Sequence, residues 1–125
     1  MRQTGIGIDL VEIERIRTAV SRWGERFLQR VYTEQELTLY RHKMESLAAR
    51  FAGKEAAVKA LCWPDRGYVA WKDIEILSDQ NGKPVVNLYG KALRQARESG
   101  IERLEISLSH TRDNAVAIVL GVSRT

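Results

Sequence analysis

Alternating apolar and polar residues mark several stretches of this chain as β-strands. Between residues 5 and 11, two isoleucines and a leucine fall on one face of such a strand, while two glycines and Asp9 fall on the other. Because glycine has no side chain, the second face lets another backbone or a ligand approach closely. The other strands predicted in this way are 73–77, 85–89 after the hairpin signal Asp79–Gly82, and 104–108.

Apolar residues at steps of three and four predict helices between these strands. The first predicted helix is 11–31, with Trp23 in its apolar stripe and a bend or division at Gly24. A second helix is opened by the capping box of Thr33 and Glu36 and includes Leu37, Tyr40 and Met44. A long helix runs from Ser46 and ends before Pro64, and a short one at 91–99 is closed by Gly100. The final apolar run, 115–121, is typical of a strand buried on both faces. This order predicts a single α+β domain over residues 1–125, with helices on one side of a mostly antiparallel sheet.

The composition is that of an ordinary globular protein. The chain has 125 residues, 44% hydrophobic and 29% charged, and no apolar run is long enough to span a membrane. The N-terminus lacks the apolar core of a signal peptide, and the single cysteine, Cys62, excludes an internal disulfide and a cysteine-based zinc site. A cytoplasmic location is therefore expected.

Positive charge is concentrated in the first predicted helix. The net charge is +4, and residues 15–30 include five arginines and only one acidic residue. Arg15, Arg22, Arg26 and Arg30 form one basic stripe if the helix axis stays roughly continuous. Such a cluster is either a solvated helix face or a surface for an anionic partner.

The long helix contains a carboxylate in an unusual place. One side of this helix consists of Phe51, Glu55, Val58 and Cys62. A buried unpaired charge is very costly, so Glu55 needs a partner, which is Lys59 one turn further on, a metal ion, or both. Asp9, at the end of the glycine-bearing strand face, either joins such a site or caps the helix that follows.

Four blocks of sequence together resemble the acyl carrier protein synthase type of 4′-phosphopantetheinyl transferase. They are Gly-Ile-Gly-Ile-Asp at 5–9, Arg-Phe-Ala-Gly-Lys-Glu-Ala-Ala-Val-Lys-Ala at 50–60, Asn-Gly-Lys-Pro at 81–84 and Ser-Leu-Ser-His at 107–110. The blocks lie in the family's order, and the resemblance spans essentially the whole chain. The second block, with an Asp-bearing strand upstream, is its most specific part.

This resemblance implies a fold, a reaction and partners. The fold is that of the 4′-phosphopantetheinyl transferases, and the reaction transfers the phosphopantetheine arm of coenzyme A to a serine of apo-acyl carrier protein, in support of fatty acid biosynthesis. Adenosine 3′,5′-bisphosphate is the other product. Family members use magnesium and form homotrimers with active sites between subunits. Neither nucleic acid nor a membrane is expected as a partner.

The resemblance also assigns roles to particular residues. Mg²⁺ is usually bound by one or two carboxylates plus substrate phosphate and water, and Asp9 and Glu55 supply that pair. Glu55 is also the candidate general base for the serine, and Lys59 is placed to stabilise charge on the phosphates. The residues expected to bind coenzyme A are Arg50, Lys54, Lys59, Gly82, Lys83, Pro84 and His110. Those expected to meet the acidic carrier protein are Arg15, Arg22, Arg26 and Arg30.

The sequence departs from the family pattern in two places, and two other functions fit part of it. Residues 62–64 stand where relatives commonly have a glycine-containing turn, and the stretch 41–46 is shorter than in some relatives, which leaves the role of Lys43 open. A nucleic-acid-binding module would use the arginines but leaves Asp9 and Glu55 unexplained. A magnesium-dependent nucleotide hydrolase would use both carboxylates without needing an acidic protein partner.

Overall fold

The computed structural model describes residues 2–64 and 69–123, and every helix and strand predicted from periodicity is present in it. The strands are β1 (Arg2–Glu12), β2 (Ile74–Ser78), β3 (Pro84–Leu88), β4 (Arg103–His110) and β5 (Asn114–Ser123). The helices are α1 (Ile13–Trp23), α2 (Glu25–Val31), α3 (Glu34–Tyr40), α4 (Met44–Ala60) and α5 (Gly90–Glu98), with a short 3-10 helix, η2, at Trp71–Asp73. Among the described residues, no helix is both long and apolar enough to cross a membrane.

The strands form two antiparallel sheets, so the fold is α+β as predicted, with the expected sheet divided in two. One sheet has the order β1-β5-β4, and the other is the hairpin β2-β3. In the larger sheet Asp9 of β1 lies opposite Ala117 of β5, and His110 of β4 lies opposite Ala115 of β5. Ala115 and Ala117 are two residues apart on β5, so their side chains are on the same face of the sheet. Asp9 and His110 therefore share one face of this sheet, on its two outer strands.

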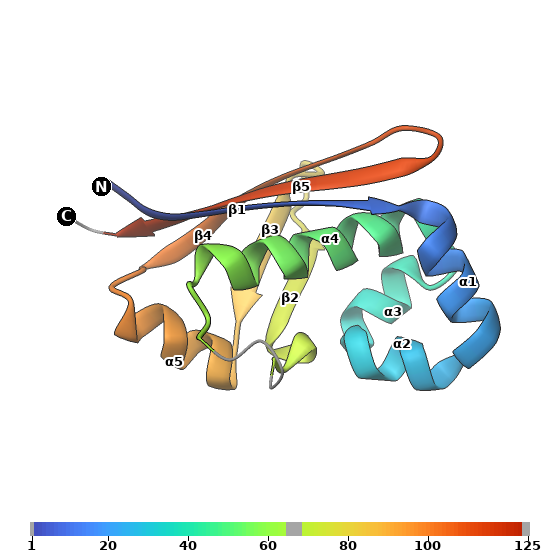
Figure 1. Cartoon of the computed structure of the whole chain (residues 1–125), viewed down its shortest axis with the longest axis horizontal. Helices are drawn as coiled ribbons and strands as arrows, with labels where there is room; N and C mark the ends of the chain where they lie inside the picture. Colours follow the sequence, from blue (N-terminus) through green and yellow to red (C-terminus); the bar gives the residue numbers. More distant parts are fainter. Residues whose placement is uncertain (1, 65–68, 124–125) are drawn as a thin grey trace.

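The glycines of β1 allow α4 to rest directly on the sheet (Figure 1). A Cβ atom on Gly5 would overlap the carbonyl oxygen of Ala60, and one on Gly7 would overlap that of Ala56. The predicted close approach to the glycine-bearing face is confirmed, and the approaching backbone is that of α4. This contact sets the position of every functional residue on the helix relative to β1.

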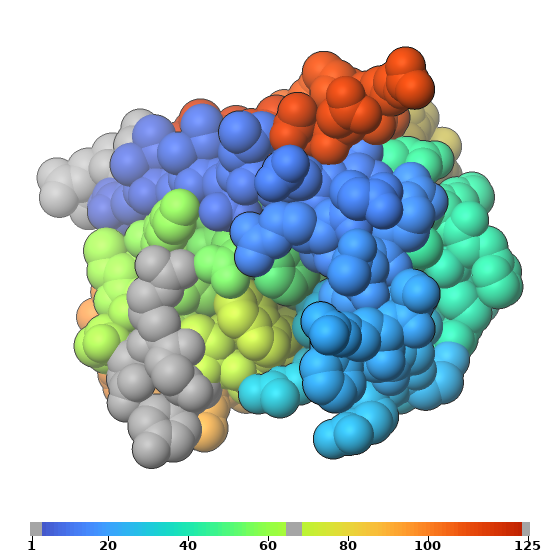
Figure 2. Space-filling view, turned by 45° about the vertical axis from the view of Figure 1, so that its right-hand side comes forward, coloured from blue at the N-terminus to red at the C-terminus, as the bar shows by residue number. Residues whose placement is uncertain are grey.

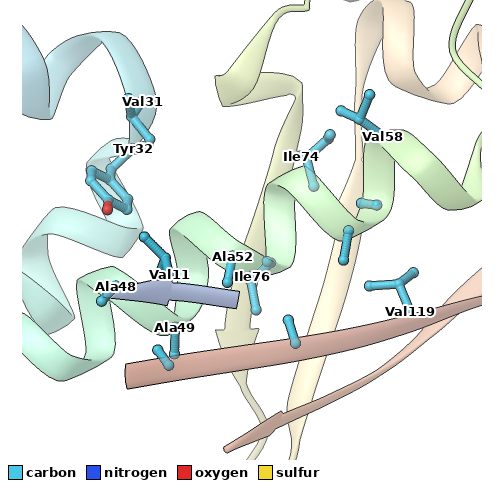
Figure 3. Close-up of a cluster of buried hydrophobic side chains, with 14 of the residues drawn as sticks. Val11, Val31, Tyr32, Ala48, Ala49, Ala52, Val58, Ile74, Ile76 and Val119 are labelled. Atoms are coloured by element: carbon cyan, nitrogen blue, oxygen red, sulfur yellow. The ribbon is translucent and has the colours of Figure 1, made fainter. Parts of the chain in front are cut away.

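Alanines and glycine form much of the buried surface of α4. Its alanines pack with Val11, Ile76 and Val119 in the core (Figure 3). Phe51 and Glu55, by contrast, are only partly buried. The sequence pattern suggested that the side of α4 that contains Glu55 is its buried side. The main buried side is instead the one with the alanines and glycine, because these small residues let the helix backbone reach the sheet.

Gly24 divides the first predicted helix into two. Its φ is +54° with ψ at −131°, outside the helical region, and α2 turns away from the axis of α1 (Figure 1). Arg15 and Arg22 therefore lie on one helix and the other two candidate arginines on the next. The predicted division at Gly24 is confirmed, and the condition for a single basic stripe, a continuous helix axis, is not met.

The capping box at the start of α3 is confirmed. The Glu36 N–H donates to Thr33 Oγ1 (3.2 Å), and the Thr33 N–H donates to Glu36 Oε1 (2.8 Å). Met44 begins α4 instead of extending α3, since residues 41–43 separate the two helices.

The outer face of the larger sheet, away from α4, is apolar and exposed. Its exposed residues are Ile6 (56%), Ile8 (57%), Leu10 (66%) and Ile118 (38%). Burial of β5 on both faces was thus a wrong prediction for the single chain. The alternate residues Ala115, Ala117 and Val119 are fully buried, whereas Ile118 is not.

Candidate active site

Asp9 and Lys59 meet where β1 passes α4. The Lys59 Nζ lies 3.5 Å from an Asp9 carboxylate oxygen and donates a 2.8 Å hydrogen bond to the Ile8 carbonyl oxygen. The Asp9 side chain remains 21% exposed, so solvent and a ligand can reach it. The N-cap of α1 is Glu12, three residues beyond Asp9. The alternative that Asp9 caps this helix is therefore excluded.

A second candidate carboxylate, that of Glu55, belongs to the helical turn of α4 that precedes Lys59. It lies on the same flank of α4 as Lys59, which is four residues further on. The glycine contacts show that β1 and α4 run in opposite directions, with two strand residues passing four helix residues. Asp9, two residues beyond Gly7, is thus level with the helical turn before Ala56. Because helical side chains lean toward the helix N-terminus, we expect the Glu55 carboxylate to extend toward that level.

The donor set at this position fits magnesium. Mg²⁺ usually takes one or two protein carboxylates and fills its other positions with water and substrate phosphate. Asp9 and Glu55 are the candidate pair, and the Asp9 carboxylate is balanced here by the Lys59 ammonium 3.5 Å away. Within the described ranges, no group of three or more His, Cys, Asp and Glu could hold a metal. A metal here would therefore complete its coordination with water or substrate oxygens.

A second group of predicted residues lines a pocket of about 290 Å³. The pocket lies between the first turns of α4, the β2-β3 hairpin and the end of β4. It contains four of the residues expected to bind coenzyme A, namely Arg50, Gly82, Pro84 and His110. Gly82 has a φ of +82° in the hairpin turn, which confirms the turn signal that predicted it.

Arg50 is the buried cation of this pocket. Its Nε donates to the Ile76 carbonyl oxygen (3.0 Å), and its Nη2 donates to Ser78 Oγ (3.2 Å). The guanidinium carbon lies 3.7 Å from the centre of the Tyr40 ring. Burial lowers the Arg50 pKa, but a guanidinium stays charged in proteins. These bonds use two of its five N–H donors, which leaves others for an anionic ligand.

The two groups of residues lie on opposite flanks of α4. Lys59 bonds to β1 through Ile8, whereas Arg50 bonds to β2 through Ile76. The helix stands between them. A single chain therefore does not bring all the predicted site residues together around one ligand.

Lys54 has a different environment from the one predicted. Its side chain is fully buried, and its Nζ donates to Glu36 Oε1 (2.8 Å) and to the carbonyl oxygens of Trp71 (3.1 Å) and Ile74. Burial lowers the Lys54 pKa, and the adjacent Glu36 carboxylate acts in the opposite direction. All three N–H donors are used inside the protein. The prediction that Lys54 binds a phosphate was wrong, because its direction from the helix is toward the core.

Lys83 and His42 have exposed side chains. Lys83 lies at the tip of the β2-β3 hairpin, where its backbone N–H donates to the Asp79 carboxylate (3.0 Å). Its predicted contact with a phosphate stays a prediction. Sequence reasoning missed Tyr40 and Ser78, which contact Arg50 and line the pocket, because neither belongs to a motif.

Comparison with known proteins assigns the chain to a family. The family model described as the 4′-phosphopantetheinyl transferase superfamily matches residues 5–119. This chain belongs to that superfamily. A relative from Herpetosiphon aurantiacus named holo-[acyl-carrier-protein] synthase is 49% identical over 122 residues, which cover 93% of this chain and 96% of the relative. One of the same name from Dehalococcoides mccartyi is 48% identical over 115 residues, covering 92% and 95%.

Solved structures agree with this assignment. The holo-[acyl-carrier-protein] synthase of Neisseria meningitidis is 36% identical with a TM-score of 0.85, covering 98% of this chain and 100% of that one. The Helicobacter pylori synthase, in complex with coenzyme A, is 33% identical with a TM-score of 0.83, covering 94% and 99%. The predicted fold and family are confirmed, and the protein is a phosphopantetheinyl transferase.

The candidate partner surface of this transferase lies on α1 and α2, which face the viewer in Figure 2. The four arginines expected to bind the carrier protein are all exposed. Trp23, at the end of α1, is 53% exposed, and the Arg26 guanidinium lies 6.0 Å from its ring centre. Sequence reasoning placed Trp23 in the apolar stripe and so missed it. Its position immediately before the helix-dividing Gly24 was the available signal.

Proposed function

We propose that this transferase moves the 4′-phosphopantetheine arm of coenzyme A to a serine of an apo-acyl carrier protein, in the cytoplasm and in support of fatty acid biosynthesis. The main supporting observation is that Asp9 lies beside Lys59 at the β1–α4 junction, because Lys59 belongs to the sequence block that is most specific for the family. The Arg50 pocket supports it further, because a buried guanidinium suits a ligand with several phosphates.

Each group has a chemical task in this proposal. The serine oxygen forms a bond to the phosphorus that bears the pantetheine arm, and the bond from that phosphorus to the leaving bisphosphate breaks. Asp9 and Glu55 would hold Mg²⁺, which would supply positive charge to stabilise the charge that builds up on the phosphates. Lys59 stabilises the same negative charge, and Glu55 accepts the serine proton directly or through water. Arg50 and His110 bind the phosphates of the leaving bisphosphate.

We further propose that the site is completed between subunits of a homotrimer. The two groups of site residues lie on opposite flanks of α4, so one ligand reaches both only when two chains contribute. The exposed isoleucines and leucine of β1 supply a surface for self-association, because such apolar patches on soluble proteins mark interaction sites.

Replacing Ile8 with glutamate is expected to dissociate the assembly. A charge at the centre of the apolar face loses its hydration on association, so the unmodified chain should behave as three copies of 14.2 kDa and the variant as one. Light scattering after gel filtration gives both masses. Leu39→Glu, at a residue 51% exposed on α3, is the matched control and should remain trimeric. A trimeric Ile8→Glu protein would contradict the proposed interface.

The α1–α2 surface is proposed to bind the acidic carrier protein. Exposed arginines beside an exposed tryptophan combine electrostatic steering with an apolar anchor, a pairing enriched at protein interfaces. We therefore infer that Trp23 contributes to carrier-protein affinity together with Arg22 and Arg26.

Arg22→Glu is expected to weaken carrier-protein binding about tenfold at low salt, mainly through slower association, and less at high salt. Trp23→Ala should weaken binding with little salt dependence, since it removes apolar contact area. Surface plasmon resonance at two salt concentrations measures both. Arg94→Glu, on α5, is the control. Equal effects of Arg22→Glu and Arg94→Glu would show that net charge, not this surface, governs binding.

Mass spectrometry of the carrier protein tests the proposed reaction. The protein is incubated with coenzyme A, Mg²⁺ and apo-acyl carrier protein, and the expected result is a mass gain of one phosphopantetheine group on the carrier. No gain with any carrier protein would reject the proposal. Release of the bisphosphate without a carrier would support the alternative of a magnesium-dependent nucleotide hydrolase.

A further inference from the structure

An ion pair is completely buried beneath the Arg50 pocket. Glu36 of α3 and Lys54 of α4 are both 0% exposed, and their charged groups lie 2.8 Å apart. Burying two charges carries a large desolvation penalty, and buried ion pairs can often be replaced by apolar residues without loss of stability. Its contacts indicate what this pair does besides contributing to stability.

The Glu36 carboxylate joins three parts of the fold. Its Oε1 accepts hydrogen bonds from the Thr33 N–H (2.8 Å) and from Lys54 Nζ (2.8 Å). Its Oε2 accepts a hydrogen bond from the Ile76 N–H (2.8 Å). One carboxylate thus links the start of α3 to α4 and to the middle of β2.

Lys54 holds the same part of the hairpin sheet. Its Nζ donates to the carbonyl oxygens of Trp71 and Ile74. Trp71 is the first residue of η2, which leads into β2, and Ile74 is the first residue of β2. Within residues 2–64 and 69–123, β3 is the single strand that pairs with β2. The ion pair therefore takes the place of a neighbouring strand along the other edge of β2.

The strand held in this way positions Arg50. Ile76 gives its N–H to Glu36, and its carbonyl oxygen accepts the hydrogen bond from Arg50 Nε (3.0 Å). Two residues on, Ser78 Oγ accepts from Arg50 Nη2 (3.2 Å) and from the Tyr40 hydroxyl (3.2 Å). The atoms that orient the guanidinium thus belong to the strand edge that the ion pair holds.

We propose that Glu36 and Lys54 are positioning residues for coenzyme binding: by binding the open edge of β2, they hold the Ile76 carbonyl that orients Arg50 in the pocket. This inference rests on the proposed function, in which Arg50 binds coenzyme phosphates. An apolar pair of similar size would fill the space but would leave the Ile76 N–H and the Ile74 carbonyl without these partners. The ion pair therefore also serves the geometry of this strand edge.

The test compares Lys54→Met with Ile101→Ala. Ile101 is a buried core residue beside Gly121, and its truncation lowers stability without contacting β2. At a temperature where both variants are folded, Lys54→Met should raise the Kd and KM for coenzyme A at least tenfold while kcat changes less than threefold. Ile101→Ala should leave all three constants within twofold of the unmodified protein. An unchanged coenzyme Kd in Lys54→Met would overturn the proposal.

A double-mutant cycle shows whether the effect acts through Arg50. In an Arg50→Met background, adding Lys54→Met should raise the coenzyme Kd less than twofold, because the group being positioned is already absent. Additive effects would reject positioning. If Lys54→Met does not fold, Glu36→Asp takes its place, since it keeps the charge but shortens the carboxylate's reach to Ile76. Absence of coenzyme binding by the unmodified protein would overturn the proposed function itself, and this inference with it.

Discussion

Asp9→Ala is expected to lower the kcat of carrier-protein modification by at least about 10²-fold, because it removes half of the carboxylate pair that would hold the metal. The fold should survive the change. Asp9 and its partner Lys59 are both partly exposed, so the freed ammonium remains hydrated. Transfer measured by mass spectrometry, with circular dichroism spectra of both proteins, provides the comparison.

Glu12→Ala is the matched control for Asp9→Ala. It removes a carboxylate three residues along the same strand, from an exposed position, and should leave the rate almost unchanged. A chelator should abolish activity of the unmodified protein, and excess Mg²⁺ should restore it, but not in Asp9→Ala. Glu55→Gln should behave like Asp9→Ala. Near-normal turnover by either site variant would remove the proposed metal site from the mechanism.

Gly7→Ala is expected to destabilise the protein by about 3 kcal/mol or more, or to prevent folding. The added methyl group would overlap the carbonyl oxygen of Ala56, and a helix backbone packed against a sheet cannot move aside locally. The whole of α4 would have to shift, and Lys59 and Glu55 with it. Urea unfolding followed by circular dichroism measures the change.

Gly53→Ala provides the contrast for Gly7→Ala. Its added Cβ would approach Ile76 Cδ1 at 2.5 Å, but that atom is the end of a flexible side chain. The helix interior also gains about 1 kcal/mol from the replacement of glycine by alanine. Gly53→Ala should therefore change stability by about 1 kcal/mol or less. Equal losses in the two variants would show that the α4–β1 contact does not limit the packing.

The prediction of the elements succeeded because local patterns determine them. Alternation over 5–11, the capping box at Thr33 and the turn signal before Gly82 each act over a few residues, and each feature is present in the structure. The predicted burial was less successful. Whether Ile118 is covered depends on what packs outside the sheet, and no spacing within β5 contains that information.

The positions of the site residues were also only partly predictable from the sequence. Asp9 and Lys59, which the sequence assigned to one site, lie beside each other, because the glycine-bearing face of β1 packs against α4. The motif did not show that the Lys54 side chain points in a different direction, into the core. Adjacent residues on a helix differ in direction by about 100°, so the motif's lysine at 54 enters the core while its neighbour at 55 remains at the surface.

The sequence alone determined the family, the α+β class and the order of the elements, because each depends on residue type and local spacing. Only the tertiary structure decided the rest. It divided the sheet in two, placed the Arg50 pocket and the Asp9–Lys59 pair on opposite flanks of α4, and buried Lys54 against Glu36. These outcomes depend on how α4 crosses the sheets, and that crossing is set by close backbone contact at two glycines of β1.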